Sequence, residues 1–496
     1  SWYEKLQRWS DACAAYERKQ SEDPTNLTWR LGRMRCHRAL GDWETLGELA
    51  RETWDSPTLG LHNDATSRAE VARLAAAAAW NLRQWGPMAT YSASMPDGTV
   101  ETCLVRAVVS VHEGRFSAAQ VCIDDARRLL DSEFTALVGE SYHRAYRIMI
   151  EVLQLAELEE IIAHRQRPSD LPMPLLTRMW QERIEAAQRD ADVWQAILSV
   201  RYLAVPPAND TRTWLKFCSL CRKAGRSSLS RKLLSQLLVD GRSSPAAGGD
   251  GGSAASSLAA DADLNVRLNL SMGLGGSRSA DDPFSRARPE VAFAYFKQLW
   301  ADGSRYDALE RMRVFAREAV SPMSEVDLVL AAKAWLKLGE WQRALLDNSL
   351  GDAAKMQVVV QSLQRATELN PTSYKAWHAW AMINFEAVSL YQDFKYVVPS
   401  IAGFVRSISL GRGQALQDTL RLLTMWFKYG ASEAVDEAVS RGFQLIPVEM
   451  WLDVTPQIIA RIHTGIQRVR SSVHTLLNLV AKAHPQGLIY PLTVAS

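Results

Sequence analysis

Leu40-Gly41-Asp42-Trp43 is the stretch of sequence that decides the fold, because it recurs along the N-terminal part of the chain. Glycine just past a helix can adopt the left-handed conformation that ends the helix. The aromatic residue two positions later opens the next helix and packs back on the first. Successive copies, offset by 34, 42 and 31 residues, are Leu6-Gln7-Arg8-Trp9, Leu40-Gly41-Asp42-Trp43, Leu82-Arg83-Gln84-Trp85 and His112-Glu113-Gly114-Arg115-Phe116. This spacing predicts helical hairpins of the tetratricopeptide type.

Between these turns the sequence has helical periodicity. Apolar residues recur at i, i+3, i+4 and i+7 in stretches such as Glu70 to Trp80, Ser141 to Leu158 and Ala415 to Trp426, and β-branched alternation is almost absent. Two further copies of the turn, Lys223-Ala224-Gly225-Arg226 and Leu338-Gly339-Glu340-Trp341, extend the repeat. The sequence therefore predicts an all-α fold, an α-solenoid of stacked hairpins.

The composition is that of an ordinary globular protein. The 496 residues carry a net charge of +2, so no chain-wide excess of either sign points to a nucleic acid or an acidic tail. No apolar run reaches the roughly 20 residues of a membrane span. Six cysteines make no disulfide framework, and the 17 tryptophans are expected to lie mostly in hairpin cores. Because Ser1 to Lys5 contain neither an initiator Met nor a signal-peptide pattern, we expect an excised piece of a longer chain.

One segment differs from the rest. From Asp240 to Arg288 the chain is dominated by Gly, Ser, Ala and Asp, with almost no aromatic residue. Such a composition buries too little apolar surface to offset the entropy of ordering, so we predict a disordered insertion. Gly273 to Ser277 resembles a phosphate-binding loop only faintly, because no strand precedes it. The predicted organisation is tetratricopeptide-like repeats over 1–239, the insertion over 240–288, and further repeats over 289–496.

The sequence contains no catalytic constellation that we recognise. The metalloprotease, nucleophile-elbow, Walker and protein-kinase motifs are all incomplete. Cys218 and Cys221 form a C-x-x-C pair inside a helical pattern without a second pair, which indicates buried thiols rather than a metal site. His378, between Trp377 and Trp380, is expected to pack among aromatic rings.

Several specific strings resemble one family. They are Trp2 to Leu6, Leu31 to Cys36, Gly139 to Tyr142, Arg212 to Lys216, Tyr374 to Trp380, Phe404 to Leu410 and Leu488 to Ser496. Together with the repeats they are similar to the FAT region of the target-of-rapamycin (TOR) kinases, which are phosphatidylinositol-3-kinase-related kinases. The glycine-rich insertion has no counterpart in that pattern, and the loop from Tyr391 to Tyr396 is shorter than in the vertebrate pattern.

The resemblance implies an architecture and a role. Tetratricopeptide-like repeats would be followed by HEAT-like repeats, and the array would clamp a kinase domain that begins beyond Ser496. The segment itself would be non-catalytic, in a parent serine/threonine protein kinase that controls growth in response to nutrients. The implied partners are the kinase domain of the same chain, a Raptor- or Rictor-type subunit and a β-propeller subunit. The implied location is the cytoplasm, with recruitment to lysosomal, vacuolar or other endomembrane surfaces.

The resemblance also implies a ligand. The family binds inositol hexakisphosphate, as a structural ligand rather than a catalytic cofactor, in a pocket lined by Lys and Arg. The matching positions are Arg189, Lys216, Lys223, Lys297, Lys333, Lys337 and Lys375. At Lys333 the vertebrate pattern has Arg, so the charge is kept but the bidentate fork is lost.

Local physical arguments bear on some of these cations. The stretch from Glu325 to Leu338 is apolar nearly all round, which predicts a buried helix in which Lys333 and Lys337 need a counter-charge. Lys216 and Lys223 lie two turns apart on one helix face, and Lys375 falls in a first helical turn, where a cation opposes the macrodipole. The alternative is that these lysines are simply solvated, with their stems along partly buried faces.

Two other functional classes remain open. A generic tetratricopeptide adaptor would capture peptide tails in a concave groove, and a helical enzyme would need a constellation that we do not find. The long matching strings favour the kinase scaffold over both. The sequence immediately after Ser496 distinguishes the first two, because only the scaffold requires a kinase domain there.

Overall fold

The computed structural model describes residues 2–56, 64–240, 288–319, 327–346, 353–411 and 415–495. Within these ranges every regular element is a helix, which confirms the predicted all-α solenoid. The chain divides into two compact units, Ser1–Asp302 and Gly303–Ser496. The helix Pro289–Ala301, the first after the glycine-rich segment, belongs to the first unit. The sequence alone predicts it among the C-terminal repeats.

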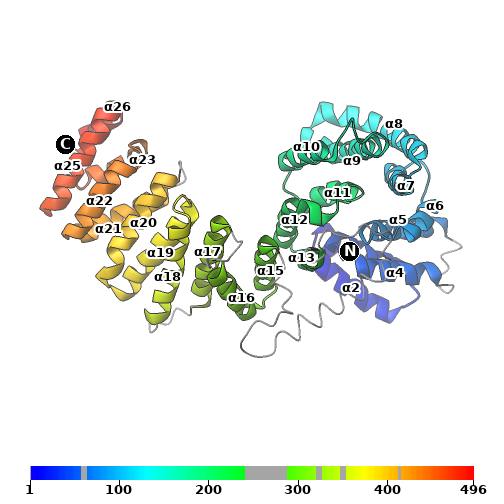
Figure 1. The fold of residues 1–496 in the computed structure, drawn as a ribbon, viewed down its shortest axis with the longest axis horizontal. Coiled ribbons are helices and arrows are strands. Elements are labelled where there is room, and N and C mark those ends of the chain that lie inside the picture. The colour runs from blue at the N-terminus through cyan, green and yellow to red at the C-terminus, as the bar shows by residue number, and fades with distance from the viewer. Residues whose placement is uncertain are drawn as a thin grey trace. The chain divides into compact units, whose positions relative to one another are not determined.

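The first unit is a succession of helices, most of which pack on the next one along the chain (Figure 1). Most connections between them are short, as expected for stacked hairpins. The helices are α1 (Trp2–Lys5), α2 (Trp9–Glu22), α3 (Leu27–Leu40), α4 (Trp43–Asp55), α5 (Ala65–Asn81), α6 (Trp85–Ala93), α7 (Val100–His112), α8 (Phe116–Glu140), α9 (Tyr142–Gln166), α10 (Met173–Ala186), α11 (Ala191–Arg201), η2 (Pro207–Asp210), α12 (Thr211–Lys223), α13 (Ser227–Asp240) and α15 (Pro289–Ala301).

The recurring turn in this unit has the predicted conformation. Gly41, Gly114 and Gly225 have φ of 72°, 77° and 78°, in the left-handed region. After Gly41, the amide of Asp42 donates to the carbonyl of His37 at 3.0 Å, which closes the turn as a Schellman-type cap. Gln7 and Arg83 occupy the glycine position of two copies and are also left-handed, with φ of 55° and 61°. The turn is therefore imposed by the hairpin packing even where no glycine eases it.

The second unit is also a stack of helices and comprises the elements from α16 onward (Figure 1). Its core is centred on large buried side chains such as Phe404, Trp426 and Trp451, which fits the expectation that tryptophans fill the array. The helices are α16 (Arg305–Glu318), α17 (Leu328–Leu345), α18 (Ala353–Leu369), α19 (Tyr374–Tyr391), η3 (Phe394–Tyr396), α20 (Val397–Leu410), α21 (Leu416–Tyr429), α22 (Glu433–Leu445), α23 (Glu449–Leu452), α24 (Thr455–Ile459), α25 (Gln467–Ala483) and α26 (Pro485–Ala495).

One predicted turn is wrong. Leu338-Gly339-Glu340-Trp341 lies inside α17, which runs on to Leu345. Gly339 is buried, and a Cβ built on it would lie 2.5 Å from a methyl carbon of Leu363 on α18. This glycine serves the close approach of two helices, and the sequence pattern could not distinguish that role from a helix end.

Two further expectations concern the glycine-rich insertion and the lack of a membrane-spanning helix. The predicted insertion, from Asp240 to Arg288, lies outside the described residues except for its two end residues. No helix that the structure describes combines the length and the apolar character needed to cross a bilayer.

Candidate functional site

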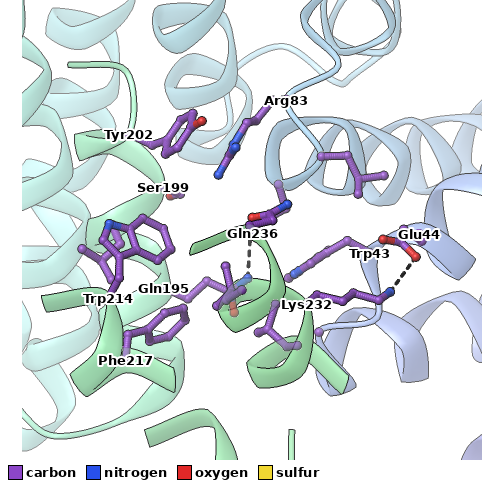
Figure 2. Close-up of a pocket in the computed structure, with 16 residues that line it drawn as sticks. Trp43, Glu44, Arg83, Gln195, Ser199, Tyr202, Trp214, Phe217, Lys232 and Gln236 are labelled. Atoms are coloured by element: carbon purple, nitrogen blue, oxygen red, sulfur yellow. Dashed lines mark hydrogen bonds and ion pairs between the residues drawn. The ribbon is translucent and has the colours of Figure 1, made fainter. Parts of the chain in front are cut away.

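The first unit curls until helices far apart in sequence meet. The ammonium of Lys232 on α13 lies 2.7 Å from a carboxylate oxygen of Glu44 on α4 and 3.6 Å from one of Asp42 (Figure 2). A methyl carbon of Leu229 lies 3.0 Å from where a Cβ on Gly41 would stand, so glycine is needed here for space as well as for conformation. We call this meeting of α13 with the α3–α4 turn the closure contact.

A small pocket lies beside the closure contact, with a volume of about 100 Å³ (Figure 2). Its walls mix polar and apolar side chains, with the ring of Trp43 on one side and those of Tyr202, Trp214 and Phe217 on the other. The guanidinium of Arg83 lies over the ring of Tyr202, 3.4 Å from the ring centroid. Its two cations, Arg83 and Lys232, already contact Tyr202 and Glu44, so we assign the pocket to the packing of the closure.

A second, larger pocket of about 510 Å³ opens on helices α3, α5, α7 and α9 of the same unit. Its charged lining comprises Arg35, Arg38, Arg73, Arg147, Glu101, Glu151 and Asp192. Glu101 binds both Arg38 at 3.0 Å and Arg73 at 3.4 Å, while Arg147 lies 3.5 Å from Glu151. Burial lowers the pKa of Arg38 despite the nearby Glu101. Because carboxylates already neutralise these arginines, an anion would have to compete with them. We call this hollow the arginine pocket.

Four of the predicted ligand cations lie in the first unit. One of them, Lys216, contacts Glu185 at the end of α10 together with Arg212. The ammonium of Lys216 lies 2.6 Å from its carboxylate and the guanidinium of Arg212 lies 3.8 Å away. The pKa of Glu185 is lowered, first by the hydrogen bond from Lys216 and to a smaller extent by Arg212 and Arg189. Lys216 therefore contacts a carboxylate that the sequence analysis did not foresee, and Arg189 acts on the same carboxylate through its charge.

The other two predicted cations of the first unit have different surroundings. Lys223 is exposed at the end of α12, two turns beyond Lys216 as predicted. Lys297 on α15 is half-buried, and its ammonium lies 4.3 Å from the ring centroid of Phe293. Helix α12 packs against α15, so both cations belong to one helical layer.

The second unit holds Lys333, Lys337 and Lys375. Lys333 is exposed on α17, and Lys337 is half-exposed and paired with Glu340. The predicted burial of this helix on all sides is therefore wrong, because α17 keeps a solvent-facing side and both ammonium groups reach it. Lys375 lies in the first turn of α19, as predicted, after the N-cap Ser373. Within the described residues, no ion-pair partner is found for Lys333 or Lys375.

Two lesser predictions are confirmed. Cys218 and Cys221 are buried, and burial raises the pKa of both thiols, that of Cys221 to about 12. His378 stacks on Tyr374 with ring centroids 5.7 Å apart. What the sequence did not show is that His378 Nδ1 also lies 2.8 Å from the buried carboxylate of Asp418.

Comparison with known proteins places these repeats in a family. A family model described as "FAT domain" matches residues 72–424. The serine/threonine-protein kinase mTor of Drosophila melanogaster is 38% identical over an alignment that covers 100% of this chain and 20% of that protein. The serine/threonine-protein kinases TOR of Arabidopsis thaliana and TOR2 of Saccharomyces cerevisiae are 37% and 33% identical, again over 100% of this chain.

The fold has a counterpart among solved structures. The structure titled "FAT and kinase domain of CtTel1" superposes with a TM-score of 0.60 at 11% identity, covering 98% of this chain and 35% of that one. The chain itself spans about a fifth of the length of the curated relatives that it matches. The predicted resemblance to the FAT region of TOR kinases is confirmed, and the chain belongs to the FAT domain family.

Proposed function

We propose that this chain is the non-catalytic scaffold of a TOR-like serine/threonine kinase and clamps a kinase domain that lies after Ser496 in the same chain. The similarity to TOR kinases over the full length of the chain carries this proposal. The stacked helices support it, since an α-solenoid offers a long surface on which another domain can dock. The parent protein would control growth in response to nutrients from the cytoplasm and endomembrane surfaces, with Raptor- or Rictor-type and β-propeller subunits.

Hydrogen exchange and a kinase assay test the scaffold together. The 496-residue chain alone is expected to transfer no phosphate from ATP to a protein substrate, whereas a chain extended past Ser496 transfers it. Amides on one face of the solenoid are expected to exchange more slowly in the extended chain, because the docked domain covers them. Phosphotransfer by the short chain would contradict the proposal. An extension without a kinase sequence would instead favour the adaptor, which would capture peptide tails in a concave groove.

We further propose that the chain binds inositol hexakisphosphate through its predicted cations. The observation that supports this is that Lys216, with Arg212 beside it, contacts the exposed carboxylate of Glu185, while Arg189 is near enough to act on the same carboxylate electrostatically. One carboxylate leaves this cluster with surplus positive charge, and a polyphosphate could replace it as the counter-ion. The ammonium groups of Lys223 and Lys333 are exposed, so each could bind phosphate without breaking an ion pair with a carboxylate that the structure describes.

Charge reversal tests the polyphosphate site in each unit separately. Lys216→Glu with Lys223→Glu is expected to weaken binding of inositol hexakisphosphate at least tenfold, because each cation–phosphate hydrogen bond contributes about 1.5–3 kcal/mol. The same loss is expected for Lys333→Glu with Lys337→Glu. Native mass spectrometry shows whether the ligand is bound, and isothermal titration calorimetry gives its affinity.

The matched control for this experiment is Arg128→Glu with Arg144→Glu. Both arginines are exposed, and each pairs with an acid on or next to its own helix. This double variant changes the net charge by the same amount as each lysine pair, because two cations again become two carboxylates. The control is expected to keep most of its affinity. An equal loss in the control would show that only overall charge matters, and a wild-type chain that never binds the polyphosphate would end the proposal.

A further inference from the structure

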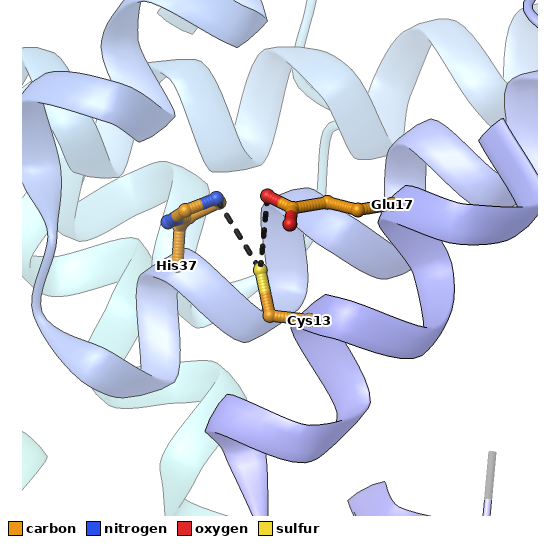
Figure 3. Close-up of side chains that lie close together, drawn as sticks. All are labelled: Cys13, Glu17 and His37. Carbon is orange, nitrogen blue, oxygen red and sulfur yellow. Dashed lines mark hydrogen bonds between the residues drawn. The ribbon is translucent and has the colours of Figure 1, made fainter. Parts of the chain in front are cut away.

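A buried cysteine and a buried histidine meet an acidic side chain between α2 and α3. Cys13 Sγ lies 3.5 Å from His37 Nε2 and 4.0 Å from Glu17 Oε1 (Figure 3). Cys13 and Glu17 are four residues apart on α2, so their side chains share one face of that helix. The three potential ligand atoms all lie within 4.8 Å of one another, an arrangement found for no other such trio in the part of the chain that the structure describes.

The geometry of the trio fits a zinc ion. With Zn–S of about 2.3 Å and Zn–N of about 2.0–2.1 Å, tetrahedral coordination sets sulfur and nitrogen about 3.5 Å apart. The observed Cys13–His37 distance has this value. The sulfur–oxygen distance is longer than the corresponding separation, but Glu17 is exposed and its unbranched side chain can rotate toward the sulfur. Three protein ligands leave a fourth position on the solvent side.

A second carboxylate orients the histidine. His37 Nδ1 lies 3.3 Å from Asp42 Oδ2, on the side of the ring away from Cys13. Nδ1 makes no hydrogen bond in this geometry, but a small rotation would let its N–H donate to Asp42. That tautomer leaves the lone pair of Nε2 directed at the trio, as a metal requires. Histidine ligands usually donate their other ring nitrogen to a carboxylate in this way.

The surroundings separate this trio from an ordinary surface cluster. Cys13 and His37 are each only 8% exposed, and they lie beside a small apolar cluster that includes Ala12, Tyr16 and Cys36. Glu17 is shared with Arg33, whose Nε lies 3.3 Å from its carboxylate. A divalent ion would therefore take Glu17 from a surface ion pair, which is worth little, and would replace the hydrogen bond between Cys13 and His37.

We propose that Cys13, Glu17 and His37 bind one Zn²⁺, with Asp42 orienting the histidine and water in the fourth position. Binding removes the proton of the Cys13 thiol and any proton on His37 Nε2, and both are released to solvent. The ion would join α2 to α3 and so fasten the first hairpin of the array. This inference does not depend on the proposed scaffold role.

Cobalt is the probe for this site, because Co²⁺ replaces Zn²⁺ and its thiolate complexes absorb visible and near-ultraviolet light. Titration of the untagged, reduced chain with CoCl₂ is expected to give a thiolate-to-cobalt band that saturates at one equivalent and disappears when ZnCl₂ is added. Cys13→Ser is expected to abolish the band. Asp42→Asn is expected to weaken cobalt binding by about 10–100-fold, as for other groups that orient a metal-bound histidine.

Two further variants keep the test decisive. Glu17→Gln changes an exposed side chain and leaves the fold intact, so weaker cobalt binding in it cannot be attributed to unfolding. Cys36→Ser removes a buried thiol of the same cluster that is not a proposed ligand, and it is expected to keep the band. A wild-type chain without a cobalt–thiolate band, or a band that survives Cys13→Ser, would show that Cys13 and His37 only share a hydrogen bond and would overturn the proposal.

Discussion

Arg201→Met is expected to destabilise the packing of α9 against α11 by about 3 kcal/mol, because the buried carboxylate of Glu157 then keeps only a distant ion pair, 3.9 Å from Arg183. Arg201 donates two hydrogen bonds to Glu157, from Nε at 2.8 Å and from a terminal nitrogen at 2.6 Å. A third, to the carbonyl of Trp180, ties in α10 at 2.8 Å. Glu157 is fully buried, so solvent cannot replace what the arginine supplies. Native-state hydrogen exchange of the α9 and α11 amides measures the loss locally.

Matched variants separate this effect from the loss of any salt bridge. Arg178→Met breaks the exposed pair with Glu182 on α10 and is expected to cost only about 0.3–0.5 kcal/mol. Adding Glu157→Leu to Arg201→Met is expected to recover most of the stability, since the buried charge is then gone. If Arg201→Met costs no more than Arg178→Met, the Glu157 pair is not desolvated in the way that the structure indicates.

The loss of stability caused by Arg201→Met is also expected to depend on pH. Burial already raises the pKa of Glu157, although Arg201 partly offsets the effect, so removing the arginine raises that pKa further. A carboxyl with a raised pKa binds more protons when folded than when unfolded. Its contribution to stability is therefore greatest at low pH and is lost as the pH rises through the raised value. The gap between variant and wild type should narrow as the pH falls.

Gly403→Leu is expected to be the other severe substitution, with a cost of about 3 kcal/mol from overpacking. Gly403 on α20 faces Ala381 on α19, and a Cβ there would lie 2.8 Å from the Ala381 Cβ and 3.0 Å from its Cα. Because one of these atoms is backbone, a rotamer change cannot make room and the two helices must move apart. Even Gly403→Ala is expected to cost at least about 1 kcal/mol.

The control for Gly403→Ala is a Gly→Ala substitution at a helical position where a methyl group meets no other atom. Gly86 on α6 has no atom within 4 Å of a built Cβ, so Gly86→Ala is expected to be neutral or to stabilise by up to about 0.5–1 kcal/mol. Chemical denaturation gives the change in the free energy of unfolding for each Gly→Ala variant. A loss for Gly403→Ala with no loss for Gly86→Ala would confirm that the close approach of α19 and α20 requires glycine at position 403. A neutral Gly403→Ala would contradict it.

Much of the fold could be predicted from the sequence because its turns use a local chemical signal. A glycine two residues before an aromatic side chain marks the left-handed helix ends at Gly41 and Gly114. The same signal fails at Gly339, where the glycine lets two helices approach. It is also incomplete at Arg83, which adopts the left-handed conformation without being glycine. A local sequence pattern shows which backbone conformation a residue prefers, whereas the packing of neighbouring helices decides which conformation it adopts.

The candidate sites were less predictable, for a different reason. The sequence could place Lys216 and Lys223 on one face of a helix, since that depends only on helical spacing. It could not show Glu185 beside Lys216, and it wrongly buried Lys333, because exposure depends on which neighbouring helices cover a face. The trio at Cys13 also joins two helices, and no spacing rule foretells which side chains of a hairpin will touch.

The closure contact changes how the first unit can unfold and evolve. An open array whose repeats touch only their neighbours frays from either end and tolerates gain or loss of a repeat. Here Lys232 binds Glu44, 188 residues away, so the N-terminal hairpins cannot fray without breaking a contact made near the other end. Inserting or deleting one hairpin would move α13 off the α3–α4 turn. A change in the number of hairpins would therefore lose this ion pair, a cost that contacts between neighbouring repeats alone would not impose.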